Sequence, residues 1–165
     1  MRLVDLVLSM PFLLIAIVAQ KIFDAPGILS LLFILGALSW TTLARVTRTK
    51  ALEVRRQDFV EAARALGASH ARIVFRHVLP GVVGPIIAIS TIMVANMIMA
   101  ESAMSYLGLG VRPPVASWGS MLSESESLFI GEPRLMLYPA ALISLAVFGF
   151  NLFGEGLRDA FDPKD

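Results

Sequence analysis

Long apolar runs alternate with shorter polar segments along this chain, and the runs determine its expected architecture. A helix that crosses a bilayer needs about 17 to 25 mostly apolar residues. Four runs are close to that length, at residues 3–20, 28–44, 82–104 and 135–152. None alternates apolar and polar residues as membrane barrel strands do, and other backbone forms leave polar groups unpaired in hydrocarbon. The pattern therefore predicts an all-α membrane protein with about four transmembrane helices.

Two prolines lie within these runs. Pro11 falls inside the first run, and we expect it to kink that helix because proline lacks the N–H of a helical hydrogen bond. Pro85 falls near the start of the third run. We expect it in the first turn of its helix, where a missing N–H costs little.

The composition supports a membrane protein and excludes several kinds of chemistry. Hydrophobic residues make up 56% of the chain and charged residues 16%, with a mean hydropathy of +0.75. A net charge of +1 leaves no surplus of cations for a general nucleic-acid binder. The chain has no cysteine, which excludes disulfides, thiolate metal sites and cysteine nucleophiles.

Catalysis by this chain is not expected. No Walker-type Gly-Lys motif is present, so any ATP hydrolysis belongs to a partner subunit. An intramembrane enzyme would need grouped catalytic side chains, but Asp5 and Glu101 lie near opposite ends of their helices. His70 and His77 have no third metal ligand in the sequence, and no histidine or cysteine accompanies the methionines of the third run. We therefore expect no metal site and no cofactor.

The basic residues predict the orientation in the membrane. If the polar segment between the second and third runs is cytoplasmic, 11 of the 14 lysines and arginines face the cytoplasm. They are Arg2, Arg45, Arg48, Lys50, Arg55, Arg56, Arg64, Arg72, Arg76, Arg158 and Lys164. The other three, Lys21, Arg112 and Arg134, then face outward. By the positive-inside rule both termini are cytoplasmic.

The cytoplasmic segment, residues 45–80, is expected to contain two short helices. Asp58 and Glu61 match a capping box at the start of the first helix, and Gly67 is suited to end it in a left-handed turn. An apolar face at helical spacing is formed by Phe59, Ala62, Ala63 and Leu66. Ser69 can cap the second helix, and Leu79-Pro80 then redirects the chain into the membrane. The result is a helical elbow, residues 58–80.

The elbow has two interpretations. A basic loop can bind anionic lipid headgroups without any other role. Alternatively, Ala62 and Ala63 beside a glycine give a face of small residues into which another protein can fit closely. The sequence pattern alone leaves both interpretations open.

Residues 61–80, EAARALGASHARIVFRHVLP, resemble the EAA loop of permease subunits of bacterial ATP-binding-cassette importers. The matching positions are Glu61, Ala62, Ala63, Gly67, Leu79 and Pro80. His77 stands where the general pattern often has isoleucine. This histidine is similar to the dipeptide/oligopeptide/nickel branch of these permeases. The flanking segments SYLGLGVRPPVASWGSML and NLFGEGLRDAFDP resemble the same branch.

The resemblance implies a fold, a function and partners. It implies a single transmembrane permease domain over residues 1–165 with a MetI-like fold, lacking the first two of the six helices of the family. Residues 45–80 would form the cytoplasmic coupling loop, whose elbow would insert into a groove of cytoplasmic ATPase subunits. A second permease subunit would complete a heterodimer in the lipid membrane, and an extracytoplasmic solute-binding protein would deliver dipeptides or oligopeptides. The alternatives are nickel import and a non-transporting, truncated membrane anchor.

Two residues of the elbow have alternative roles. Glu61 can pair with a basic residue of the ATPase or cap its own helix. Arg64, three positions later, can bridge Glu61 or reach the partner, and an exposed bridge would stabilise the helix only slightly. Both alternatives stay open at the level of the sequence.

The third apolar run places polar residues and methionines on one helical face. These residues are Met93, Asn96, Met97, Ala100, Glu101 and Met104. Ionisable groups in membrane helices usually face a bundle interior or an aqueous cavity, and methionine adapts to varied ligands. The face can therefore line a translocation path through Met93, Asn96, Met97 and Glu101. The alternative is helix packing, with Asn96 as an interhelical hydrogen-bond partner.

Overall fold

Almost every described residue is helical or in a short connection between helices. The computed structural model describes residues 2–23, 28–111 and 113–161, and this part of the chain contains no strand. The helices are α1 (Arg2–Leu8), α2 (Phe12–Phe23), α3 (Ile28–Arg55), α4 (Asp58–Ala65), α5 (His70–Ile73), the π-helical turn η1 (Val74–Val78), α6 (Leu79–Tyr106), α7 (Trp118–Glu126) and α8 (Arg134–Phe161). The all-α prediction is confirmed. Arg112 and Lys164, used above for orientation, lie outside the described residues.

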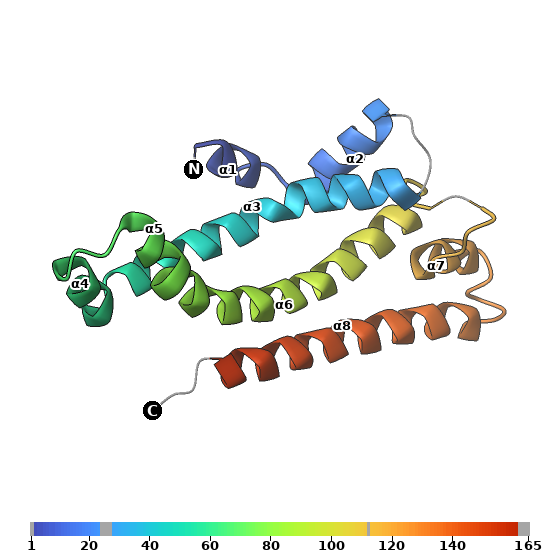
Figure 1. Cartoon of the computed structure of the whole chain (residues 1–165). Helices are drawn as coiled ribbons and strands as arrows, with labels where there is room; N and C mark the ends of the chain where they lie inside the picture. Colours follow the sequence, from blue (N-terminus) through green and yellow to red (C-terminus); the bar gives the residue numbers. More distant parts are fainter. Residues whose placement is uncertain (1, 24–27, 112, 162–165) are drawn as a thin grey trace.

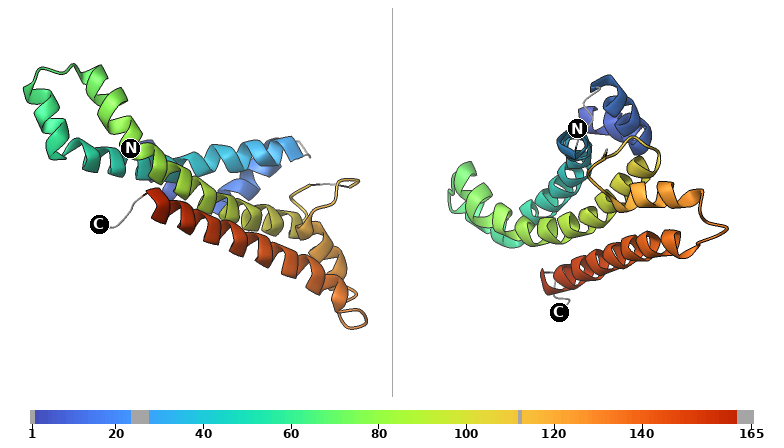
Figure 2. Two further views of the ribbon diagram at one scale, coloured as in Figure 1. Left: turned by 60° about the horizontal axis from the view of Figure 1, so that its bottom comes forward. Right: turned by 90° about the vertical axis from the view of Figure 1, so that its right-hand side faces the viewer.

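The long helices form the centre of the molecule. Figure 1 shows α6 between α3 and α8, with α1 and α2 beside α3 on the side away from α8. The elbow and the C-terminal end of α8 lie toward one end, and α7 lies at the other. Figure 2 shows the elbow projecting beyond the ends of α3 and α6. The two polar excursions between the long helices therefore lie at opposite ends of the molecule.

In the part of the chain that the structure describes, three helices are long and apolar enough to cross a membrane. They are Ile28–Arg55, the continuous helix His70–Tyr106 and Arg134–Phe161, and they contain the second, third and fourth predicted spans. The first predicted span is divided into α1 and α2, neither of which reaches that length. Pro11 lacks an N–H and disfavours helical geometry at Met10 before it. The expected kink is therefore a complete break between two short helices.

The third long helix begins earlier than the hydrophobic pattern predicts. Its described length from His70 to Tyr106 is 37 residues, and it runs without a turn through α5, η1 and α6. The ring of Pro80 would clash with the carbonyl of Arg76 in a regular α-helix, but Arg76 lies in the wider π turn. The prediction that Leu79-Pro80 redirects the chain is wrong. Pro85 is likewise inside the helix, not in its first turn.

Close contact between α6 and α8 depends on glycines. A Cβ added at Gly84 would lie 2.8 Å from the Cβ of Phe161. A Cβ at Gly154 would lie 2.6 Å from Cγ1 of Ile92 and 3.3 Å from the Ala88 carbonyl oxygen. Small residues let membrane helices approach closely, which increases van der Waals contact where no hydrophobic effect drives association. These two glycines fix α8 against α6.

A small core connects α2, α3 and α6. Ala16, Leu31 and Met104 are fully buried in it, with Ile34 and Leu35 nearly so. Met104 was predicted to share the polar face of the third run. Its burial among apolar side chains makes it a packing residue.

Candidate functional site

The first helix of the elbow starts differently from the predicted capping box. The N-cap residue is Gln57, whose side chain makes no capping hydrogen bond, and Asp58 is already the first helical residue. The capping-box prediction for Asp58 and Glu61 is therefore wrong. Both carboxylates still lie in the first turn of α4, where they interact favourably with the positive end of the helix dipole.

The first helix of the elbow ends as predicted. Gly67 has φ +80°, in the left-handed region that favours glycine. The Ala68 N–H donates to the Ala63 carbonyl at 3.1 Å, and the Gly67 N–H donates to the Arg64 carbonyl at 3.0 Å. This pair of hydrogen bonds is the Schellman motif. It reverses the chain into the second helix of the elbow.

The second helix of the elbow also starts as predicted. Ser69 is the N-cap of α5, and its hydroxyl oxygen accepts a hydrogen bond from the Arg72 N–H at 3.4 Å. Because α5 continues through η1 into α6, the cap is also the start of the 37-residue helix. The elbow therefore ends in a rigid connection to the membrane-spanning region.

Few contacts hold the elbow together. Val60 and Ile73 are buried, and the rings of Phe59 and His77 lie 6.0 Å apart between centroids. Val60 is thus the inward residue of α4. On the predicted apolar face, Phe59 is 50% exposed and Leu66 is 89% exposed. That face points outward, where it is available to a partner.

The residues that the EAA-loop resemblance assigns to ATPase docking also lie on the elbow. Glu61, Ala62, Arg64 and Gly67 are exposed, and Ala63 is half-buried. Within the described ranges, Glu61 and Arg64 form no ion pair with each other or with another residue. Leu79 and Pro80 are exposed at the start of α6. The structure therefore groups the first five residues on α4 and its C-terminal turn, with Leu79 and Pro80 at the base of the elbow.

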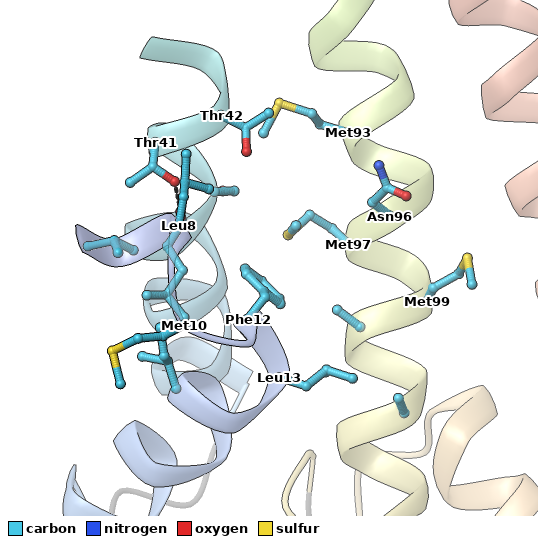
Figure 3. A pocket seen from close by; sticks show the side chains of 16 residues that line it. Leu8, Met10, Phe12, Leu13, Thr41, Thr42, Met93, Asn96, Met97 and Met99 are labelled. Carbon is cyan, nitrogen blue, oxygen red and sulfur yellow. Dashed lines mark hydrogen bonds between the residues drawn. The ribbon is translucent and has the colours of Figure 1, made fainter. Parts of the chain in front are cut away.

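A cavity of about 470 Å³ lies between α6, α3 and the break between α1 and α2. Met93, Asn96 and Met97 line it from α6, facing Thr42 and Phe12. Figure 3 shows Met93 and Met97 extending from α6 toward the side of the cavity where Thr42, Leu8 and Phe12 lie. Three of the four residues predicted to line a translocation path therefore share one cavity. The break between α1 and α2 at Pro11 leaves room for this cavity.

Glu101 lies outside this cavity. It lines a separate cavity of about 360 Å³ with Ala116, Ser117, Trp118 and Met121. The Ser105 hydroxyl donates to Oε1 of Glu101 at 2.6 Å, which fixes the carboxylate near the C-terminal end of α6. The predicted face is thus divided into a methionine-lined cavity and an acidic one.

One contact beside the larger cavity has no signal in the sequence. Nη2 of Arg45 on α3 contacts Oδ1 of Asp5 on α1 at 2.7 Å. Both side chains are largely exposed, so the pair adds little to stability. Its effect is positional, because it holds α1 against α3 while Val7 and Leu8 of α1 line the cavity. Forty residues separate the partners, and local pattern cannot identify such a pair.

The structure brings no metal-ligand cluster together in the part of the chain that it describes. No group of three or more His, Cys, Asp or Glu side chains there could hold a metal ion. His70 and His77 lie on the elbow, and His77 contacts the Phe59 ring.

Comparison with known proteins places these features in a family. The sequence profile described as "Binding-protein-dependent transport system inner membrane component" matches residues 1–164. The chain is 40% identical over 165 residues to the oligopeptide transport system permease protein OppC of Salmonella typhimurium, and 39% identical over 165 residues to OppC of Escherichia coli. It is 38% identical over 164 residues to the glutathione transport system permease protein GsiD of Salmonella paratyphi A.

These alignments cover 99% or 100% of this chain and 54% of each relative. The chain therefore spans about half the length of the curated relatives it matches. The profile match, by contrast, extends over nearly all of the chain, and the spacing of the elbow residues and the three long apolar helices agree with it. The chain belongs to the family of binding-protein-dependent transport system inner membrane components and has the MetI-like fold of that family.

Proposed function

We propose that this chain acts as a permease subunit of an ATP-binding-cassette importer that moves dipeptides or oligopeptides across the bacterial cytoplasmic membrane. The observation that carries the proposal is the exposed elbow with Glu61, Gly67 and Pro80 at the spacing of the EAA loop. The printed functions of the relatives, oligopeptide and glutathione transport, support a peptide cargo. Separate ATPase subunits, a second permease subunit in a heterodimer and a solute-binding protein complete the importer.

The elbow supports a docking role through its surface. Phe59 and Leu66 expose apolar area on the outward side of α4, while Val60 fixes the helix from the inward side. Exposed contiguous apolar residues mark interaction sites on soluble surfaces. A groove on an ATPase subunit would cover them, and Glu61 and Arg64 remain available to charged residues at its rim.

The connection between elbow and membrane supports a coupling role. Because α5, η1 and α6 form one helix, a displacement of the elbow tilts or shifts that helix without a flexible joint. The same helix carries Met93, Asn96 and Met97 along the larger cavity. ATP-driven movement of the elbow would therefore change the shape of this cavity directly.

The translocation path is proposed to pass the methionine-lined cavity and the Glu101 cavity. Methionine side chains adapt to cargo of varied shape. Glu101 offers a carboxylate near Trp118 at the outer end. In this proposal the elbow side is cytoplasmic with both termini, as the distribution of basic residues indicates.

Two elbow variants in the assembled importer test the coupling function. Gly67→Pro cannot adopt the positive φ of the Schellman turn, and Glu61→Lys reverses a charge on the docking face. We expect both to insert into the membrane normally while transport in proteoliposomes no longer follows ATP hydrolysis by the partner ATPase. Gly36→Ala, at an exposed helical position with open space around it, is the control. Unchanged coupling in both elbow variants would falsify the docking role.

A further inference from the structure

A third cavity, of about 210 Å³, lies where α3, α6 and α8 meet near the C-terminal end of α8. Its lining combines two kinds of residue. Pro85, Ala88, Ile89 and Ile92 form an apolar wall on α6, whereas Lys50 from α3 and Arg158 from α8 supply positive charge beside the ring of Phe161. None of the described residues that line the cavity is acidic, and neither the elbow nor the proposed path uses it.

Part of the positive charge in this cavity is unpaired. The Lys50 ammonium contacts Oε2 of Glu53 at 3.0 Å, which occupies one of its three N–H donors. Arg158 is exposed and forms no ion pair within residues 2–23, 28–111 and 113–161. Along the helices, Glu53 follows Lys50 by three residues, and Glu155 and Asp159 flank Arg158 on α8. A guanidinium and the remaining donors of an ammonium are thus available to an anion.

The apolar wall is fixed by the close contact of α6 and α8. Gly154 meets Ile92 and Ala88, and Gly84 meets Phe161, so the cavity is bounded by close packing between these helices. The wall continues along α6 into the membrane-spanning region, while the two cations lie at the elbow end of the long helices. A ligand that fits must be anionic at one end and apolar at the other.

We propose that this cavity binds an anionic phospholipid of the cytoplasmic leaflet. Lys50 and Arg158 hold the phosphate, and an acyl chain lies along Ile89 and Ile92. Basic pockets between membrane helices on the cytoplasmic side bind such headgroups. The apolar wall favours a lipid over a free phosphate. The inference rests on the proposed membrane orientation, and it is independent of cargo and of docking to an ATPase.

Native mass spectrometry of the detergent-purified protein with added phosphatidylglycerol tests the assignment. We expect phosphatidylglycerol to bind more tightly than phosphatidylcholine of the same chain length. Lys50→Gln and Arg158→Gln should each weaken phosphatidylglycerol binding about fivefold, the effect of one basic residue on an anionic lipid. Arg48→Gln removes an exposed cation of α3 outside the cavity and should leave binding unchanged. Lys50→Arg keeps the charge and should retain binding.

Other outcomes would overturn the lipid assignment. Equal affinity for the two lipids, or an equal loss in Arg48→Gln, would show only general attraction to the membrane. Displacement of phosphatidylglycerol by glycerol 3-phosphate at comparable concentration would indicate a site for free phosphate. Loss of the lipid on assembly with the second permease subunit would identify the cavity as part of a subunit interface.

Discussion

The two polar excursions of this molecule are built in opposite ways. The elbow contacts the remainder of the chain through a few buried side chains, chiefly Val60 and Ile73, and exposes Phe59 and Leu66. At the other end, α7 is closely attached to α6 and α8. An excursion with few internal contacts can move and has surface left for a partner, whereas a tightly attached one covers the end of the bundle.

Several contacts attach α7. Ser117 and Ser120 form a reciprocal capping box, with Ser120 N–H donating to Ser117 Oγ at 3.2 Å and Ser117 N–H donating to Ser120 Oγ at 3.1 Å. The Tyr106 hydroxyl donates to Oε2 of Glu126 at 2.9 Å. The Ser125 hydroxyl lies 2.6 Å from the Met121 carbonyl oxygen and 3.1 Å from that of Leu135, at the start of α8. The capping box stabilises the start of α7, the Tyr106–Glu126 bond connects α7 to α6, and the Ser125–Leu135 bond connects it to α8.

The largest effect on stability is expected at the contact of α7 with α6. A Cβ at Gly119 would clash with the backbone of Ser102, which cannot rotate away as a flexible side chain could. Gly119→Val should therefore lower the free energy of unfolding by about 3 kcal/mol or more. Thermal unfolding in detergent measures the change, with Gly149→Ala as a helical control in open space. Equal melting temperatures for the two variants would contradict the tight attachment of α7.

A smaller effect is expected at the hydrogen bond between α6 and α7. Tyr106→Phe removes the hydroxyl that donates to Glu126 and keeps the ring. The group is exposed to solvent, so the melting temperature should fall by no more than roughly 2 °C. Tyr138→Phe is the matched control, because the Tyr138 hydroxyl makes no hydrogen bond within the described residues. A fall as large as that of Gly119→Val would mean that polar contacts, and not close packing, hold α7.

Local signals in the sequence identified much of the elbow. Gly67 and Ser69 each act within a few residues, through a left-handed turn and a cap, and both predictions are confirmed. The capping box at Asp58 failed because Gln57 adopts the N-cap geometry, and cap positions shift easily by one residue. The π turn before Pro80 was also missed, since hydrophobicity shows where a helix enters the membrane but not where it begins.

The cavities could be predicted only in part. Helical spacing placed Met93, Asn96 and Met97 on one face, and the structure brings them to one cavity. The opposite wall depends on the break at Pro11, which the sequence predicted only as a kink, and on the contact of Arg45 with Asp5, which joins distant segments. Glu101 shares the same helical face, yet α7 gives it a separate cavity. Spacing alone therefore identifies a face, and tertiary contacts decide which residues share a site.

The proposed function makes the elbow, unlike the excursion that contains α7, the docking surface for an ATPase. Leu66 and Ile130 provide a matched pair, since they are apolar side chains 89% and 99% exposed at opposite ends of the molecule. Neither Leu66→Asp nor Ile130→Asp should change the melting temperature appreciably, because neither side chain is buried. The decisive measurement is co-purification of the partner ATPase with each variant from membranes. We expect Leu66→Asp to lose the ATPase and Ile130→Asp to retain it; retention by both variants, or loss by Ile130→Asp alone, would contradict docking through the elbow.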